Sequence, residues 1–222
     1  MPASETAALD GPAAAHVRAL VRRLALQEPD LEGHSDRLAL LASIFGVGLG
    51  LTEAEITTLR QGAYLHDVGK VGVPSSILRK NGPLTTEEWG IMQQHPVLGE
   101  AICRGVPGLE DTLPIIRWHH ERWDGSGYPD RLSGENTPLF ARIMQLIDIF
   151  DALTTERPYR RTDTPQAALA IMQQETARGW RDPALMTEFE RFFPLFAAPP
   201  AAALDAYSLV ALSEAVNRGQ WA

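Results

Sequence analysis

Apolar residues recur every three or four positions along most of the chain, the spacing that places them on one face of an α-helix. Alternating β-branched runs bounded by Asn-Gly or Asp-Gly turns, which would predict β-hairpins, are missing. We therefore expect an all-α fold. The pattern predicts helices over Ala13–Leu26, His34–Phe45, Glu53–His66, Thr86–Gln94, Val97–Arg104, Asp111–Glu121, Pro138–Thr154, Pro165–Glu175, Pro183–Phe193 and Ala201–Val216.

Several of these helix starts carry capping residues. Thr52 with Glu55, and Thr85 with Glu88, fit the capping box, in which a hydroxyl and a carboxylate satisfy backbone N–H groups that have no partner within the helix. Two further segments place a capping residue before a proline suited to the first helical position: Thr164-Pro165 and Asp182-Pro183.

Two long segments rich in Gly and Pro, 67–84 and 122–137, each follow a predicted helix that carries histidine. Long structured loops in a compact domain are usually functional. We divide the chain into an N-terminal tail (1–15), one domain (16–195), and a hinge with a C-terminal helix (196–222). That last helix would either cover the domain or pair with a second chain, so a homodimer stays open.

Composition narrows the class of protein. The 222 residues are 45% hydrophobic, enough for a core that needs no disulfide, and Cys103 is the single cysteine. The net charge of −8 argues against general binding to nucleic acid or to an anionic membrane, so an anionic substrate would need a locally positive pocket. No apolar stretch is long enough to span a bilayer, and the N-terminus lacks the pattern of a secretory signal. We expect a cytoplasmic protein.

The candidate chemistry lies in the histidines. The His66-Asp67 dipeptide alone is weak evidence of a site. Adjacent His119 and His120 would point about 100° apart on one helix, so both cannot be buried on one apolar face. Their adjacency would be explained if both rings bind one metal ion. The alternative is that one ring caps a carbonyl while the other lies in solvent. The chain has six histidines: His16, His34, His66, His95, His119 and His120.

Asp148 lies in a strongly apolar predicted helix, where an ionised carboxylate is costly unless it is paired or bound to metal, and Asp151 follows on the same face. The alternative for both is a salt bridge to an arginine such as Arg142 or Arg157. Five imidazoles and two carboxylates suit iron, manganese or zinc better than calcium or magnesium. The candidate ligands are His34, His66, Asp67, His95, His119, His120 and Asp148.

At this point a family resemblance is evident over roughly residues 16–195. The chain resembles HD-GYP domains, the branch of the HD metal-dependent phosphohydrolases that hydrolyses cyclic di-GMP. The resemblance implies an HD-domain helical bundle whose Gly/Pro-rich loops line the active site. The matching blocks are GHSDR (33–37), LHDVGKVGVP (65–74), ILRKNGPLTTEEW (77–89), QHPVLG (94–99), HHERWDGSGYP (119–129) and ARIMQLIDIFDALTTERPYR (141–160).

The resemblance assigns the metal ligands. It implies that one ion is held by His34, His66, Asp67 and Asp148, and a second by His95, His119 and His120, with Asp67 bridging the two. Iron or manganese is expected, with zinc as an alternative. Some relatives hold a third ion with a glutamate four residues before the first histidine; Asp30 stands there and is one methylene shorter, so two ions are favoured. His16 matches nothing and is expected on a helix surface.

The implied reaction is hydrolysis of cyclic di-GMP to linear pGpG and onward to GMP. Two divalent ions, two carboxylates and a bridging hydroxide leave a net charge of about +1 to receive a phosphate. The hydroxide would attack phosphorus in line, and Lys70 would contact a phosphate oxygen. The alternatives are a cyclic di-GMP sensor or docking module without turnover, and a phosphohydrolase for another cyclic dinucleotide such as cyclic GMP-AMP. Other signalling proteins could dock through the GYP loop.

Further residues receive roles. Arg157 and Arg160 are candidates for guanine or phosphate contacts, the alternative being a solvated basic loop. Tyr128, in Gly127-Tyr128-Pro129, orders the loop by packing or stacks near substrate, and we favour packing. Arg131 stands where many relatives have glycine, which would stiffen the loop or add a substrate contact. Trp89 and Trp123 are expected in the core. The loop glycines Gly69, Gly72, Gly125 and Gly127 are expected to adopt backbone angles closed to other residues.

Overall fold

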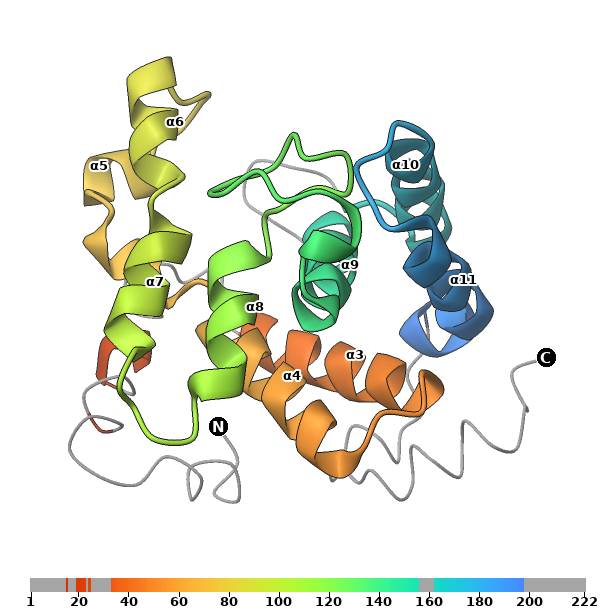
Figure 1. The fold of residues 1–222 in the computed structure, drawn as a ribbon. Coiled ribbons are helices and arrows are strands. Elements are labelled where there is room, and N and C mark those ends of the chain that lie inside the picture. The colour runs from red at the N-terminus through yellow and green to blue at the C-terminus, as the bar shows by residue number, and fades with distance from the viewer. Residues whose placement is uncertain (1–14, 16–18, 23, 25–32, 156–161, 198–222) are drawn as a thin grey trace.

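The computed structural model describes residues 15, 19–22, 24, 33–155 and 162–197. Within these residues it has helices and turns but no β-strand, which confirms the all-α prediction (Figure 1). The α-helices are α3 (His34–Gly48), α4 (Glu53–Leu65), α5 (Ser75–Leu78), α6 (Thr86–Met92), α7 (His95–Cys103), α8 (Leu113–Trp118), α9 (Leu139–Thr154), α10 (Pro165–Ala177) and α11 (Pro183–Ala197), and short 3₁₀ helices are η2 (Val68–Gly72), η3 (Glu110–Thr112) and η4 (Gly134–Asn136).

The helix starts form as the capping residues predict. Thr52 and Thr85 each begin a complete capping box, in which the threonine hydroxyl accepts from the third backbone N–H and the glutamate accepts from the threonine N–H. The Thr164 hydroxyl accepts from the N–H of Ala167. Asp182 Oδ1 accepts from Ala184 N and Leu185 N at the start of α11. These contacts satisfy donors that the first helical turn leaves without partners, and thereby fix where each helix begins.

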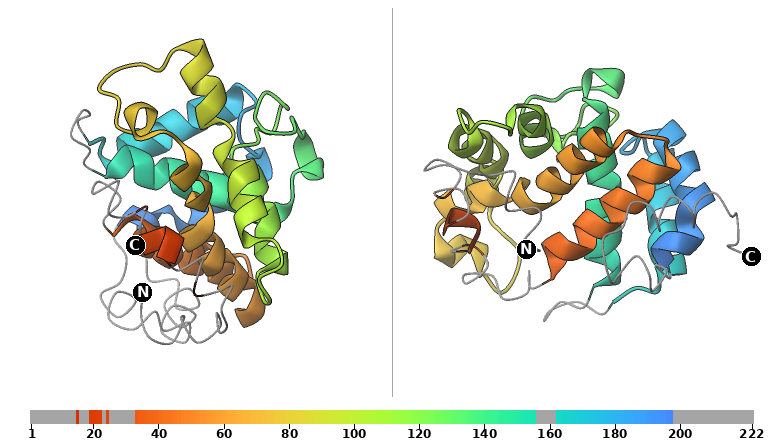
Figure 2. Two further views of the ribbon diagram at one scale, coloured as in Figure 1. Left: turned by 90° about the vertical axis from the view of Figure 1, so that its left-hand side faces the viewer. Right: turned by 90° about the horizontal axis from the view of Figure 1, so that it is seen from below.

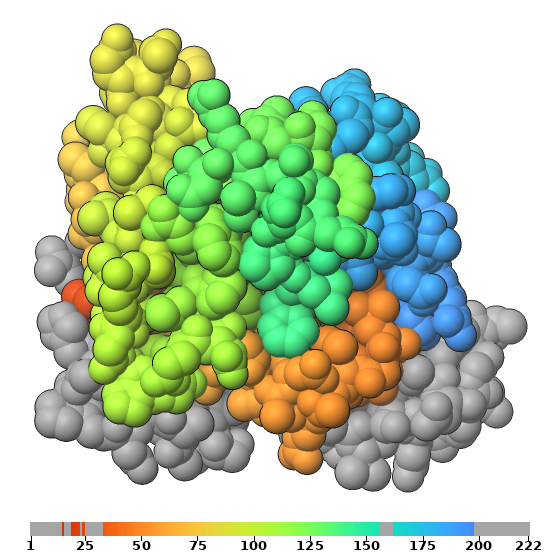
Figure 3. Space-filling view, viewed as in Figure 1, coloured from red at the N-terminus to blue at the C-terminus, as the bar shows by residue number. Residues whose placement is uncertain are grey.

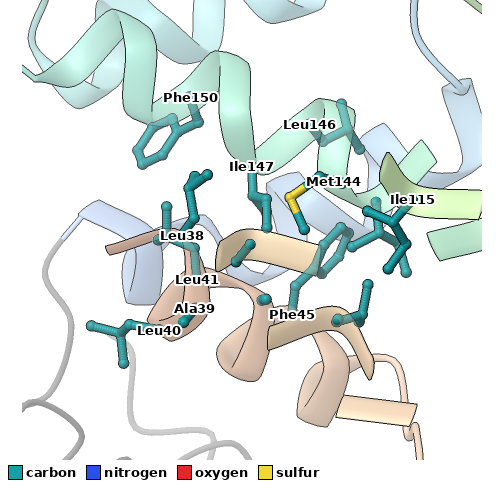
Figure 4. Packing of buried hydrophobic residues seen from close by; sticks show 14 of the residues in the cluster. Leu38, Ala39, Leu40, Leu41, Phe45, Ile115, Met144, Leu146, Ile147 and Phe150 are labelled. Atoms are coloured by element: carbon teal, nitrogen blue, oxygen red, sulfur yellow. The ribbon is translucent and has the colours of Figure 1, made fainter. Parts of the chain in front are cut away.

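The core lies where α3 and α4, side by side, are crossed by α9 and flanked by α11 (Figures 1 and 2). The Tyr64 hydroxyl donates to the Asp36 carboxylate (2.6 Å) and ties α4 to α3. Phe45 meets Phe189 and Phe196 edge-on, and those two rings stack at 4.3 Å. Figure 4 shows apolar side chains of α3, α8 and α9 filling the same space, including Leu38, Ile115, Met144 and Ile147.

The segment α5–α6 projects from this body (Figures 1 and 3). No residue of α6 is buried, because the helix packs mainly against the short α5. Trp89 is 47% exposed, so the prediction that it fills the core is wrong. Trp123, the other tryptophan expected in the core, is only partly buried.

Several helix bounds differ from the predicted ones. The predicted helix Asp111–Glu121 is too long at both ends, since η3 precedes α8 and α8 ends at Trp118. Pro114 in the first turn explains the start, because proline lacks the N–H that a helix interior needs. Both η2 and α5 lie inside 67–84, which was predicted as loop.

The predictions for the two ends of the chain are mostly outside the described residues. Within the predicted helix Ala13–Leu26, the described residues 15, 19–22 and 24 are helical. The predicted helix Ala201–Val216 and the tail 1–15, except residue 15, are not described, so the proposed division into tail, domain and hinge stays a prediction. In the described part of the chain, none of the helices combines the length and apolar character that crossing a bilayer requires.

Candidate functional site

The candidate site forms where the ends of several helices converge. His34 is the first residue of α3, and His95 the first of α7. His66 directly follows α4, and His119 directly follows α8. Asp148 comes instead from the middle of α9, on the turn that faces these ends. The bundle thus brings together side chains that are more than a hundred residues apart in the sequence.

The carboxylate of Asp67 lies at the centre of this arrangement, and its two oxygens face different imidazoles. Oδ2 lies 3.3 Å from Nε2 of His66. Oδ1 lies 3.2 Å from Nε2 of His95 and 3.9 Å from Nε2 of His119. A carboxylate with this disposition can give one oxygen to each of two cations.

Two groups of ligand atoms therefore share Asp67, and within each group the atoms lie within 4.8 Å of one another. Asp148 extends the first group, since its Oδ1 is 3.7 Å from Nε2 of His34 and 4.0 Å from Nε2 of His66. The structure thus brings together all seven residues that the sequence analysis selected. The first group is His34, His66 and Asp67, and the second is Asp67, His95, His119 and His120.

Backbone carbonyls fix which ring nitrogen of these histidines faces the centre. Nδ1 of His66 bonds to the carbonyl of Ala63 (3.1 Å), and Nδ1 of His95 to that of Met92 (2.8 Å). Nδ1 of His119 likewise bonds to the carbonyl of a residue in α8 (3.0 Å). A carbonyl only accepts, so each Nδ1 carries a proton and each ring turns Nε2, the nitrogen that can bind a cation, inward.

These inward nitrogens fit cations. Nε2 of His95 and Nε2 of His119 lie 3.5 Å apart, and two lone pairs cannot bond to each other. Nε2 of His66 is buried and has no hydrogen-bond partner among the described residues. Buried nitrogens of this kind are costly without a partner, and imidazole mixed with carboxylate is a donor set that transition metals accept. The clusters are therefore consistent with metal binding.

The charges of the site agree with this arrangement. Burial alone would raise the pKa of Asp67, but Lys70 and His66 hold it well below its usual value, so the carboxylate is ionised. Burial alone would lower the pKa of His66. The carboxylates of Asp67 and Asp148 nevertheless raise that pKa to about 9, because they stabilise a positive charge at the ring. Burial lowers the pKa of His119 and His120 well below the usual value. Neutral rings are the form that binds metal.

The alternative for the paired histidines fails, whereas the alternative for the two aspartates, a salt bridge to an arginine, holds for Asp151, which pairs with Arg37. His119 does bond a carbonyl, through Nδ1, but His120 belongs to the cluster and does not simply lie in solvent. Arg142 donates to Asp182 and to the carbonyl of Thr137, and does not pair with Asp148. Arg157, the other arginine considered, lies outside the described residues.

Asp151 has a supporting role that the sequence analysis missed. Its carboxylate is 3% exposed and accepts from Nδ1 of His34 (2.7 Å) and from Nε of Arg37 (2.6 Å). Burial raises the pKa of Asp151, but these two partners lower it overall, so the group is ionised. An ionised carboxylate behind an imidazole orients the ring and strengthens its opposite nitrogen as a ligand. One hint was available in the sequence: Asp151 lies three residues after Asp148, on the same face of the predicted helix.

We expect Asp151→Ala to weaken metal binding by about 10- to 100-fold, because His34 loses the group that orients it. The measurement is metal retention against increasing concentrations of a chelator. Asp36→Ala is the matched control, since it removes a carboxylate of α3 that bonds to Tyr64 of α4 and not to an imidazole. Equal metal retention in the Asp151 variant and in wild type would contradict the supporting role.

The loop after α8 closes one side of the site. The ring of Tyr128 stacks on His120 with centroids 4.7 Å apart, which agrees with the packing role that we favoured. Burial raises the pKa of Tyr128, so its phenol stays protonated. The buried carboxylate of Glu121 accepts from the N–H groups of Asp130 (2.7 Å) and Leu132 (3.2 Å), and so anchors the loop directly behind the histidine pair. Sequence analysis did not assign a role to Glu121.

The loop glycines meet the expectation only in part, and Arg131 has an unusual backbone conformation. Arg131 has φ 57°, a left-handed conformation in which a non-glycine residue is strained, which explains why glycine suits that position. Gly125 also has positive φ. At Gly69 and Gly127, however, the requirement is space: a Cβ on Gly69 would overlap the carbonyl oxygen of His95, and one on Gly127 would overlap backbone of residues 120–122. For those two, and for Gly72, whose φ is not positive, the predicted reason is wrong.

A pocket of about 340 Å³ opens beside the clusters. Its lining includes His119, His120 and Asp148, so a molecule in the pocket would touch the proposed ligands. Trp89 of α6 and Gln93, the residue that caps the end of α6, contribute to the lining. The loop after α8 contributes further lining residues: Arg122, Ser126, Gly127 and Tyr128. Nζ of Lys70 lies 2.7 Å from Oδ2 of Asp67, next to the same clusters.

Some predicted site residues lie outside the described residues. These are the substrate candidates Arg157 and Arg160, the third-ion candidate Asp30, and the surface candidate His16. Their assigned roles stay predictions.

Comparison with known proteins gives consistent matches. The model of the HD domain family matches residues 18–185. The cyclic di-GMP phosphodiesterase response regulator RpfG of Xanthomonas campestris pv. campestris is 38% identical over 161 residues, covering 72% of this chain and 43% of RpfG. The 3′3′-cGAMP-specific phosphodiesterase 3 of Vibrio cholerae serotype O1 is 38% identical over 148 residues, covering 67% of this chain and 32% of that protein. The chain thus spans less than half the length of these curated relatives.

Solved structures share the fold. Bd1817, an HDG"Y"P protein from Bdellovibrio bacteriovorus, superposes with a TM-score of 0.58 at 20% identity over 71% of this chain and 50% of that chain. The HD domain of the Listeria monocytogenes phosphodiesterase PgpH superposes with the same TM-score at 17% identity, over 78% of this chain and 94% of that chain. At these identities the similarity concerns the fold alone.

Proposed function

The chain belongs to the HD domain family, in its HD-GYP branch, and from this premise we propose that it is a metal-dependent phosphodiesterase that hydrolyses cyclic di-GMP. The observation that carries the proposal is the position of Asp67, whose two oxygens face two separate groups of imidazoles beside a pocket that His119, His120 and Asp148 line. The names of the relatives, which include cyclic di-GMP phosphodiesterases, support the choice of substrate.

In this proposal His34, His66, Asp67 and Asp148 hold one divalent ion, and Asp67 with His95, His119 and His120 holds a second. When bound, such a pair supplies Lewis acidity that activates water and offsets the charge of a phosphodiester. The donor set favours iron or manganese, with zinc as an alternative, and the described residues offer places for two ions.

The side chains of this protein would then position the reacting phosphate. A phosphodiester that enters the pocket can lie next to Asp148 and the His119-His120 pair. Attack by water on phosphorus would break the bond to the ribose 3′ oxygen, and that oxygen would leave with a proton. The product is linear pGpG, and a second hydrolysis would give GMP.

Lys70 has the location of a group that offsets developing charge. Its Nζ lies 2.7 Å from Asp67 Oδ2, and its side chain is 19% exposed, so it can also reach a ligand beside the clusters. An ammonium held in a partly water-excluded site stabilises negative charge that grows on phosphate oxygens in the transition state. We propose that Lys70 lowers the barrier in this way and does not hold the metal.

We expect Lys70→Ala to lower kcat about 100-fold while the metal content stays unchanged, since the variant removes a charge and no ligand. Steady-state kinetics and metal analysis of the same preparation measure the two quantities. Lys80→Ala is the matched control, because Lys80 pairs with Glu88 on the projecting segment. A loss of metal in the Lys70 variant would contradict the assignment.

The proposed activity is tested by turnover of cyclic di-GMP with manganese or ferrous iron, with products separated by chromatography. We expect pGpG to appear, followed by GMP. Tight binding without product would favour the alternative of a sensor or docking module. A second candidate substrate is 3′3′-cyclic GMP-AMP, which the name of one relative favours. Competition between the two cyclic dinucleotides in the same assay decides between them.

A further inference from the structure

Trp89 is the most exposed of the large apolar side chains among the described residues. It is 47% exposed and belongs to α6, a helix in which no residue is buried. The start of α6 is stabilised by the Thr85 capping box and by the ion pair between Lys80 and Glu88. The start of α6 therefore has stabilising contacts that do not involve the indole.

Trp89 nevertheless faces a particular part of the molecule, because it lines the pocket beside the His/Asp clusters. Ile91, two residues further along α6, is similarly exposed at 42% but does not line the pocket. Gln93, one helical turn after Trp89, does line it. The face of α6 that carries Trp89 and Gln93 thus looks into the pocket, and the face that carries Ile91 does not.

An aromatic series leads from the metal clusters to this residue. Tyr128 stacks on His120 at 4.7 Å, and Trp89 meets Tyr128 at 6.1 Å with the planes 79° apart. In a near-perpendicular contact at most one face of the indole can lie against Tyr128. Tyr128 therefore leaves at least one face of the indole uncovered.

We propose that Trp89 forms a purine-binding subsite, in which a nucleobase stacks on the indole while its phosphate reaches the metal clusters. The inference rests on the proposed function and adds to it where the base is held. Base–aromatic stacking tolerates different bases, because every base presents a π-face. The amide of Gln93 and the guanidinium of Arg122, both in the pocket lining, offer hydrogen-bonding groups for the edge of the base.

A rival use of Trp89 is the docking of another protein on an apolar face of α6. Such a face would combine Trp89 with Ile91, since both are exposed. The pocket favours the base, because the two side chains differ in whether they line it. Ile91→Ala is therefore the matched control: it removes an equally exposed apolar group from the same helix.

The test measures binding of GMP by calorimetry to the metal-loaded protein, with ribose 5-phosphate as the probe that lacks a base. We expect Trp89→Ala to weaken GMP binding about tenfold, with partial recovery in Trp89→Phe and no change in Ile91→Ala. Ribose 5-phosphate should bind equally to all four proteins. Unchanged GMP binding in Trp89→Ala, equal weakening for both probes, equal weakening by Ile91→Ala, or a wild type that does not bind GMP would each overturn the subsite.

Turnover of cyclic di-GMP separates this inference from the proposed function. With the subsite in place, Trp89→Ala should raise KM about tenfold and change kcat much less, because the indole is remote from the phosphate. If wild type hydrolyses cyclic di-GMP and the Trp89 variant has the same KM, the subsite is wrong and the function stands. If GMP binding depends on Trp89 but no substrate is hydrolysed, the subsite stands and the function is wrong.

Discussion

Replacing Asp67 with alanine is expected to lower the rate of cyclic di-GMP hydrolysis at least about a thousandfold and to reduce the metal content of the protein. The carboxylate lies between two groups of imidazoles, so its removal takes a ligand from both proposed ions. Metal ions contribute several kcal/mol of charge stabilisation in hydrolysis, which corresponds to a rate loss of that order. Kinetics and metal analysis of the purified variant measure both effects.

Two further variants make this expectation specific. Asp67→Asn keeps the shape of the side chain but removes the charge that opposes the cations, so it should resemble alanine. Asp111→Asn changes an exposed carboxylate of η3 that belongs to neither cluster and should behave as wild type. Near-normal turnover with two ions per chain in either Asp67 variant would contradict the bridging role.

The second large effect is expected from Gly69→Ala, which should destabilise the protein by about 3 kcal/mol or more. A Cβ at this position would overlap the carbonyl oxygen of His95 and the backbone nitrogen of Gly99. Both obstacles are backbone atoms of α7, so relief requires the helix to move. Because α7 begins with His95, we expect the variant to lose metal as well as stability.

Denaturant unfolding followed by circular dichroism measures the free energy. Gly90→Ala is the control, since nothing lies within 4 Å of a Cβ there and alanine is the better helix former by about 1 kcal/mol. It should therefore stabilise α6 slightly or leave the protein unchanged. If Gly69→Ala is as stable as wild type and retains metal, the close packing of η2 against α7 is not what requires glycine.

Local chemistry made much of the fold predictable from the sequence. A capping residue acts within its own first turn, so Thr52, Thr85 and Thr164 mark the starts of helices without reference to the rest of the chain. The candidate ligands were also accessible, because histidines and an aspartate in an apolar helix are unusual enough to stand out. Their convergence on Asp67 arises from the way the helices pack. From the sequence, it could be predicted only through the family resemblance.

What could not be predicted depends on tertiary contacts. Asp151 bonds to His34, 117 residues away, and nothing in its own helix specifies that partner. Trp89 was expected in the core because it is large and apolar, but α6 projects beyond the core and leaves it exposed. Gly69 was linked to backbone angles, whereas the constraint comes from the carbonyl of His95 on another element.

The central claim is that Asp67 joins two metal ions in one centre. Anomalous scattering from crystals of the protein, measured at the absorption edges of iron, manganese and zinc, tests it most directly. We expect two anomalous peaks per chain on either side of the Asp67 carboxylate, one next to His34 and His66 and the other next to His95, His119 and His120. A single peak, or peaks outside these two groups, would contradict the claim.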